Sequence, residues 1–126
     1  MIDRRMVIAT TLALTVGGSA AAEGAKPMYG LIGQLKAVPG KRAELAAILL
    51  EGTSAMPGCL SYIIAEDTAD ADALWITEVW DSKQSHDDSL KLAAVQAAIG
   101  KGRPLIAGFG SRTETAPLGG FGLPRA

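Results

Sequence analysis

The sequence has very few of the residues that build disulfide bonds and metal sites. Its 126 residues include one cysteine, Cys59, and one histidine, His86. A single cysteine excludes a disulfide bond within the chain, and one histidine with one cysteine does not supply the usual ligands of a zinc site. We therefore predict a domain that is held together by its hydrophobic core, with no metal site.

An excess of charge of either sign is also missing. The chain carries 12 Lys and Arg residues against 13 Asp and Glu residues, and no basic run is visible. Proteins that bind nucleic acid usually show a basic patch, so we expect no nucleic-acid partner. The chain is 48% hydrophobic and 20% charged, which is typical of a globular protein, and its length suits a single domain.

The first 22 residues have the pattern of an export signal. Arg4 and Arg5 precede a mostly apolar stretch at 6–16, and three small residues at 20–22 fit the specificity of signal peptidase. The apolar stretch is shorter than the roughly 20 residues that a membrane span needs. The arginine pair fits a twin-arginine signal, an ordinary Sec signal has similar charge, and a frayed helix is the third interpretation.

These boundaries predict a signal peptide at 1–22 and one domain at 23–126, whose glycine-rich tail begins near residue 116. We expect an exported bacterial protein, periplasmic or secreted, with no membrane anchor after cleavage.

Hydrophobic periodicity in the remaining chain predicts alternating strands and helices. Apolar residues alternate in the predicted strands and recur at helical spacing in the predicted helices. Strands are predicted at 28–38, 59–66, 73–80 and 109–115, one helix at 41–55, and another that begins at Asp81 or Ser82. Residues 93–99 continue that second helix or form a separate one, and residues 103–108 fit either a short helix or the approach to a strand.

This order, β-α-β-β-α-β, predicts a ferredoxin-like α+β fold in which two helices cover one face of a four-stranded antiparallel sheet. The other face would expose apolar side chains to water, which soluble monomers rarely do over a large area. We therefore expect a homodimer in which two sheets face each other and form a dimeric α+β barrel.

Several side chains on the predicted strands are candidates for binding a ligand. Trp75 and Trp80 are five residues apart, so they point to opposite faces of one strand, and each can form an aromatic wall or simply fill the core. Glu78 is a charged residue inside an apolar strand, so it is either an ion-paired structural group or a perturbed acid or base. Tyr62 can donate a hydrogen bond to a ligand, and Arg112 can hold an anionic oxygen. The structural alternative for Tyr62 is burial with a satisfied hydroxyl, and for Arg112 it is a surface position.

Three segments of the chain resemble the antibiotic biosynthesis monooxygenase superfamily, which includes the quinol monooxygenases. They read VPGKR at 38–42, MPGCLSY at 56–62 and EVWDS at 78–82, and the last leads into a helix that carries His86. The resemblance covers about residues 28–115. It implies a dimeric ferredoxin-like barrel and, for the characterised oxygenases, insertion of oxygen into a quinol or polycyclic phenol without metal or flavin.

The resemblance makes a cofactor-independent monooxygenase the first functional hypothesis, with a small aromatic or quinol substrate. His86 would act as catalytic base or hydrogen-bond donor, and Tyr62, Trp75, Trp80, Glu78 and Arg112 would bind the substrate. A histidine that only bonds to Glu78 or to a backbone carbonyl is the structural alternative. Two other functions stay open, namely a non-catalytic module that binds a small aromatic ligand and a haem-binding or haem-degrading protein.

Overall fold

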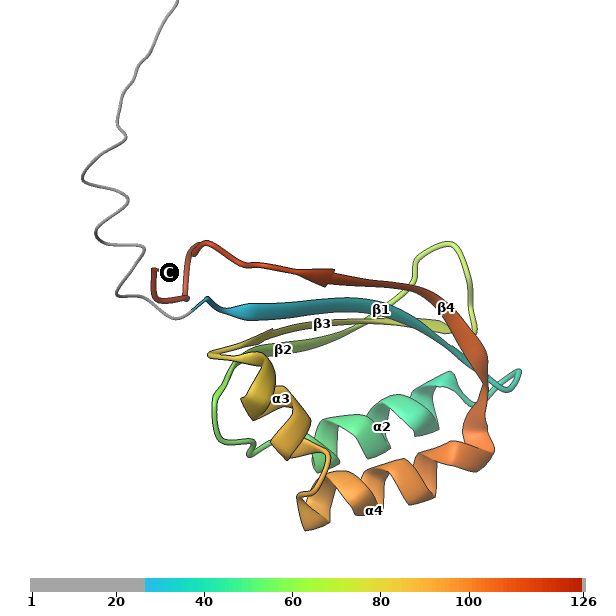
Figure 1. The fold of residues 1–126 in the computed structure, drawn as a ribbon. Coiled ribbons are helices and arrows are strands. Elements are labelled where there is room, and N and C mark those ends of the chain that lie inside the picture. The colour runs from blue at the N-terminus through green and yellow to red at the C-terminus, as the bar shows by residue number, and fades with distance from the viewer. Residues whose placement is uncertain (1–26, 126) are drawn as a thin grey trace, which may run out of the picture.

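The computed structural model describes residues 27–125, which contain one four-stranded antiparallel sheet (Figure 1). Its strands pair in the order β2-β3-β1-β4. Their bounds are β1 (Tyr29–Ala37), β2 (Cys59–Glu66), β3 (Ala73–Trp80) and β4 (Ile106–Thr115). The predicted ferredoxin-like α+β fold is confirmed. The predicted signal peptide at 1–22 lies outside the described residues.

The helices of the described chain lie together on one face of the sheet, as Figure 1 shows. They are α2 (Arg42–Gly52), α3 (Lys83–Ser89) and α4 (Ala93–Gly102). The segment after β3 thus forms two helices. Ser82 caps α3, because its side-chain oxygen accepts a hydrogen bond from the backbone N–H of Ser85 at 3.1 Å.

The last strand begins three residues earlier than the periodicity predicts. A single 3-10 turn, Arg103–Leu105, follows α4 directly and contains Pro104. The backbone N–H of Val38 donates to the carbonyl of Leu105 at 2.8 Å, which ties this turn to the end of β1. The chain therefore enters β4 at once, at Ile106.

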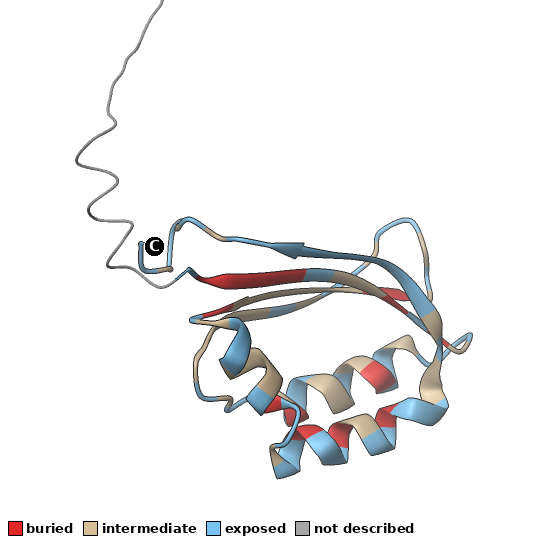
Figure 2. Cartoon of the chain, viewed as in Figure 1, coloured by how far each residue is buried: buried red, intermediate tan, exposed pale blue. Residues whose placement is uncertain are grey.

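Two hydrophobic clusters lie between the sheet and the helices. One consists of four buried aliphatic side chains from β1, α2 and β3: Leu35, Ala37, Leu45 and Leu74. The other lies toward the α3 end and contains Tyr29, Leu31 and Trp80. Figure 2 shows buried segments on β1 and on the facing sides of α2 and α4.

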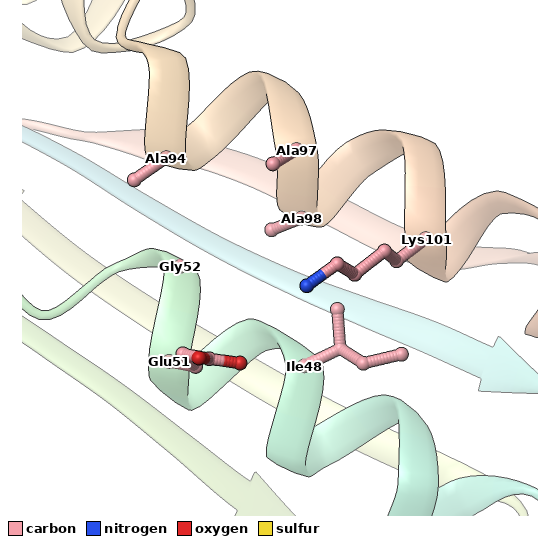
Figure 3. A pocket seen from close by; sticks show the side chains of 7 residues that line it. All are labelled: Ile48, Glu51, Gly52, Ala94, Ala97, Ala98 and Lys101. Atoms are coloured by element: carbon pink, nitrogen blue, oxygen red, sulfur yellow. The ribbon is translucent and has the colours of Figure 1, made fainter.

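Helices α2 and α4 approach each other closely because small residues face one another. A Cβ atom at Gly52 would overlap the Cβ of Ala98, so no larger residue fits at position 52 without a shift. Figure 3 shows the shallow cavity of about 130 Å³ beside this contact, with Ile48 of α2 and Lys101 of α4 at one end. This cavity is too small for most ligands.

The opposite face of the sheet has no helix over it in the described chain. Ile32 of β1, 37% exposed, and Ile63 of β2, 54% exposed, lie on this face, since both pair with Thr77 of β3. No helix within residues 27–125 is long and apolar enough to cross a membrane.

The C-terminal tail runs back to the beginning of β1. Thr115 and Pro117 pack so closely over Gly30 that a Cβ atom at that glycine would overlap Thr115. Further on, Pro124 and Arg125 line a cavity together with Met28. The two ends of the described chain therefore lie side by side (Figure 1).

Candidate functional site

Strand register gathers polar and aromatic side chains at the α3 end of the helix-covered face. Tyr29 pairs with Trp80, and Glu78 lies between Leu31 on β1 and Tyr62 on β2. Residues directly opposite one another in a sheet project to the same side. The group therefore shares one face, under α3.

His86 of α3 packs against this group. Its ring lies 5.3 Å from the Tyr29 ring and 5.5 Å from the Trp80 ring, which it meets edge to face. Its Nε2 lies 3.8 Å from Oε1 of Glu78, and its Nδ1 lies 3.1 Å from Oδ1 of Asp87. The rings and the two carboxylates fix the imidazole in one orientation.

Glu78 is the buried carboxyl group of the site, and its side chain is only 12% exposed. Burial raises the pKa of Glu78 above its ordinary value. The indole Nε1–H of Trp80 donates to Oε1 at 2.9 Å and lowers the pKa in part, as do the nearby charges of His86 and Arg112. A carboxyl group in this setting exchanges protons at a higher pH than one in water.

Two tyrosines flank the buried carboxyl. Burial raises the pKa of Tyr62 above its ordinary value, and the charge of Glu78 adds to the effect. Burial also raises the pKa of Tyr29 to about 12, and its hydroxyl donates to Oε2 of Glu114 on β4 at 2.7 Å. Both hydroxyls therefore stay protonated at neutral pH, and the hydrogen of Tyr29 is already donated to Glu114.

A cavity of about 280 Å³ opens beside Glu78, and we call it the head cavity. Its walls are mainly aliphatic and aromatic, and Glu78 and Arg112 are the charged residues among them. It is lined by Leu31, Gly33, Gln34, Leu35, Ile76, Glu78, Phe109, Gly110, Ser111 and Arg112. A mostly apolar cavity with a few convergent polar groups is the usual form of a small-molecule site.

Known proteins share this sequence pattern and this fold. The family model for antibiotic biosynthesis monooxygenases matches residues 28–101. The chain belongs to the antibiotic biosynthesis monooxygenase family. None of the proteins with curated descriptions matches it.

Solved structures similar to this family member extend the comparison. A Chloroflexus aurantiacus J-10-fl protein named after the family is 60% identical, with a TM-score of 0.75, and the match covers 77% of this chain and 99% of that one. A Caulobacter crescentus CB15 protein with the same family name is 22% identical, with a TM-score of 0.62, over 71% and 87% of the two chains. At that lower identity the likeness concerns the fold alone.

The structure brings five of the six predicted site residues of this family member together. Tyr62, Glu78, Trp80, His86 and Arg112 lie at or next to the head cavity on the helix-covered face. Trp75 lies apart, because side chains alternate along β3 and this one is on the opposite face. There its Nε1–H donates to Oδ2 of Asp67 at 2.8 Å.

Placement within the site differs from the roles that the sequence suggested. Glu78 lines the head cavity, whereas His86 is not among the residues that line it and lies behind Glu78. The structural alternative for His86, a contact with Glu78, is therefore present, and it links the histidine to the cavity.

Sequence reasoning missed Tyr29 and Phe109. The alternation of β1 placed Tyr29 on the same face as Leu31 and Leu35, but only the strand register puts it opposite Trp80. Phe109 stood at the boundary of an ambiguous segment, so no pattern assigned its face. Within residues 27–125, no group of three or more His, Cys, Asp or Glu side chains is arranged to hold a metal ion.

Proposed function

We propose that this protein is a monooxygenase that oxidises a quinol or a related phenolic small molecule without a cofactor. The observation that carries the proposal is a buried carboxyl group, Glu78, which lines an otherwise apolar cavity and has a histidine directly behind it. Family membership supports the reaction class, and the cavity supports a planar, mostly apolar substrate.

The first step is removal of a phenolic proton. Glu78 is the group that touches the substrate, and the pKa raised by burial makes its carboxylate a stronger base than one in water. His86, whose Nε2 lies 3.8 Å from Oε1 of Glu78, stabilises the proton that Glu78 takes up. Asp87 contacts Nδ1 on the other side of the imidazole. Arg112 supplies positive charge to the phenolate at the cavity wall.

Oxygen then reacts with the electron-rich anion. One oxygen atom enters the ring and the other leaves as water, while a quinol gives up four electrons in becoming a hydroxyquinone. The balance therefore needs only the substrate and O₂. Leu31 and Ile76 give the cavity apolar walls beside the phenolate, and the bound substrate adds its own apolar surface to them.

Oxygen uptake by the purified protein tests this proposal. We expect uptake that depends on a reduced naphthoquinol, exceeds autoxidation and survives a metal chelator. His86→Ala should lower kcat about a hundredfold, since positioned acid–base groups contribute roughly that much or more. Gln84→Ala is the matched control, because this residue is exposed on the same helix and bonds to Asp88.

Two results would contradict the proposal. Uptake that the chelator abolishes would point to metal chemistry. No uptake across a panel of quinols, combined with saturable quenching of tryptophan fluorescence by the same compounds, would favour the non-catalytic binding module.

We further propose that the uncovered sheet face pairs with a second copy of the chain. Ile32 and Ile63 are exposed on that face, and Trp75 lies beside them on the neighbouring strand. Ile63→Lys should convert a dimer into a monomer in sedimentation velocity. Leu50→Lys, a change at a similarly exposed position on α2, should not. A wild-type protein that sediments as a monomer would overturn the proposal.

Export of the protein is also a proposal. The pattern of residues 1–22 supports cleavage after Ala22. N-terminal sequencing of the periplasmic protein should begin at Glu23. Replacing Arg4 and Arg5 with lysine should stop export on the twin-arginine route and leave Sec export unchanged.

A further inference from the structure

A second, larger cavity adjoins the head cavity. It has a volume of about 620 Å³ and lies between α4 and the beginning of β4. Leu35 and Phe109 belong to the walls of both cavities. We call the larger one the chain cavity. Its lining residues are Leu35, Leu49, Ala98, Ile99, Gly102, Arg103, Ile106, Ala107, Gly108 and Phe109.

The chemistry of the two walls differs. Among the described residues that line the chain cavity, Arg103 carries a charge and the others are aliphatic, aromatic or glycine. The head cavity, by contrast, carries Glu78 and Arg112. Of the two adjoining cavities, the head cavity is therefore the more polar and the chain cavity is mostly apolar.

Phe109 stands where the two cavities meet and is 80% exposed. It comes directly before an irregularity in β4: Leu35 pairs with Phe109 and Gly33 pairs with Arg112, so that two residues of β4 lie opposite Gln34 alone. An extra residue of this kind bends a strand and re-aims its side chains. Glycines on both sides, Gly108 and Gly110, leave the backbone here easy to adjust.

Size also favours a ligand that uses both spaces. The head cavity, at about 280 Å³, is smaller than the usual ligand pocket of about 300–1,000 Å³, so a ligand bound at Glu78 occupies a space of ordinary size only if it extends into the adjoining chain cavity. A ring fits beside Glu78, and the chain cavity then offers an apolar wall to whatever the ring carries.

We infer that the substrate has two parts, a phenolic or quinol head at Glu78 and Arg112 and a linear apolar chain that passes Phe109 into the chain cavity. This inference rests on the proposed function, because it names the substrate class of the same site. The occupant is a chain-substituted quinol.

A series of 1,4-benzoquinols with straight alkyl substituents from methyl to decyl tests the inference on the wild-type protein. We expect kcat/KM to rise about two- to fourfold with each added methylene until the chain fills the cavity, since each buried methylene contributes a roughly constant increment. The oxidised quinones, used in calorimetric titration, report binding without turnover, and their Kd should fall by a similar factor with each added methylene.

Ala107→Trp places a large side chain at an exposed position in the wall of the chain cavity. It should weaken binding of the decyl compound by at least about tenfold and leave the methyl compound unchanged. Ala93→Trp is the matched control, since this alanine is also exposed, at the beginning of α4, and lines neither cavity. The chain-length series needs no variant, so a misfolded Ala107→Trp protein would not remove the test.

The outcomes separate this inference from the proposed function. Chain-dependent binding of quinones without any oxygen uptake would overturn the monooxygenase proposal and support the two-part ligand. Turnover of the methyl compound with no gain along the series would overturn the inference and keep the enzyme. A chain-length effect that Ala107→Trp leaves intact would place the chain elsewhere and also overturn the inference. Loss of self-association in Ala107→Trp, without any chain-length effect, would also overturn the inference. A second copy of the chain, and not the substrate, would then occupy the chain cavity.

Discussion

The space between the sheet and the helices is built differently at its two ends. At the α2 and α4 end, Leu35, Leu45 and Leu74 form an aliphatic core. At the α3 end, rings of Tyr29 and Trp80 surround a buried carboxyl and an imidazole. The first end gives the fold its stability, and the second keeps groups buried that cost stability but can move a proton.

Leu45→Ala should cause the largest loss of stability. Leu45 is fully buried at the aliphatic end, and such truncations cost about 2–5 kcal/mol because they remove contacts and leave a void. Urea denaturation should show this loss in the free energy of unfolding, while the folded fraction keeps its activity. Leu50→Ala, at an exposed position on the same helix, should change stability little. Equal losses in the two variants would show that this end is not the main core.

Glu78→Gln should lower activity without a matching loss of stability. The amide can still accept the hydrogen bond from Trp80 but cannot take up a proton, so we expect kcat to fall about a hundredfold with little change in KM. Activity close to wild type would remove Glu78 from the proposed mechanism. Glu114→Gln, at the carboxylate on β4 that is bonded to Tyr29, is the control on the far strand.

Ser82→Ala should have a smaller effect, centred on α3. Loss of an N-cap costs about 1 kcal/mol and frays a helix of seven residues, which would loosen His86 above the site. We expect a modest loss of thermal stability and a severalfold lower kcat. Ser82→Asp, which keeps a capping oxygen, should restore both. A fully active, less stable Ser82→Ala protein would show that the position of His86 does not matter.

The smallest expected effect is on the pH dependence of the free energy of unfolding. The raised pKa of Glu78 fixes its sign. Because burial raises the pKa of Glu78, the folded protein keeps a proton that the unfolded chain has already lost. Stability therefore falls as the pH rises from the ordinary value of 4.5 through the raised pKa. Glu78→Gln lacks this loss, so its stability relative to wild type should increase over the same pH range. Parallel stability profiles for the two proteins would argue that Glu78 is well solvated.

The aliphatic end was more predictable from the sequence than the polar end. Alternation and helical spacing of apolar residues predicted the elements that carry Leu35 and Leu45, and β2 and β3 have the predicted bounds. Glu78 and His86 were identified as candidates because a charge in an apolar strand and a lone histidine are unusual. Their contact and their order relative to the cavity depend on strand register and on the cap of α3. Local patterns do not encode these features.

The position of Phe109 was also not predictable from the sequence. Its face depends on an irregular pairing with β1, which inserts residues opposite Gln34. Such an irregularity has no reliable signal in a single sequence, particularly where glycines interrupt the alternation. The second cavity was therefore out of reach of sequence reasoning.

The return of the C-terminal tail to the beginning of β1 has a consequence for engineering. Met28 and Arg125 line one cavity, so a short linker could join the two ends, and the turn at 67–72 between β2 and β3 could then supply new chain ends. A circular permutant of this kind would keep the four-stranded order while its connectivity began at β3. A reporter domain could then be attached at the new chain ends, between β2 and β3, and would not lie next to the beginning of β1.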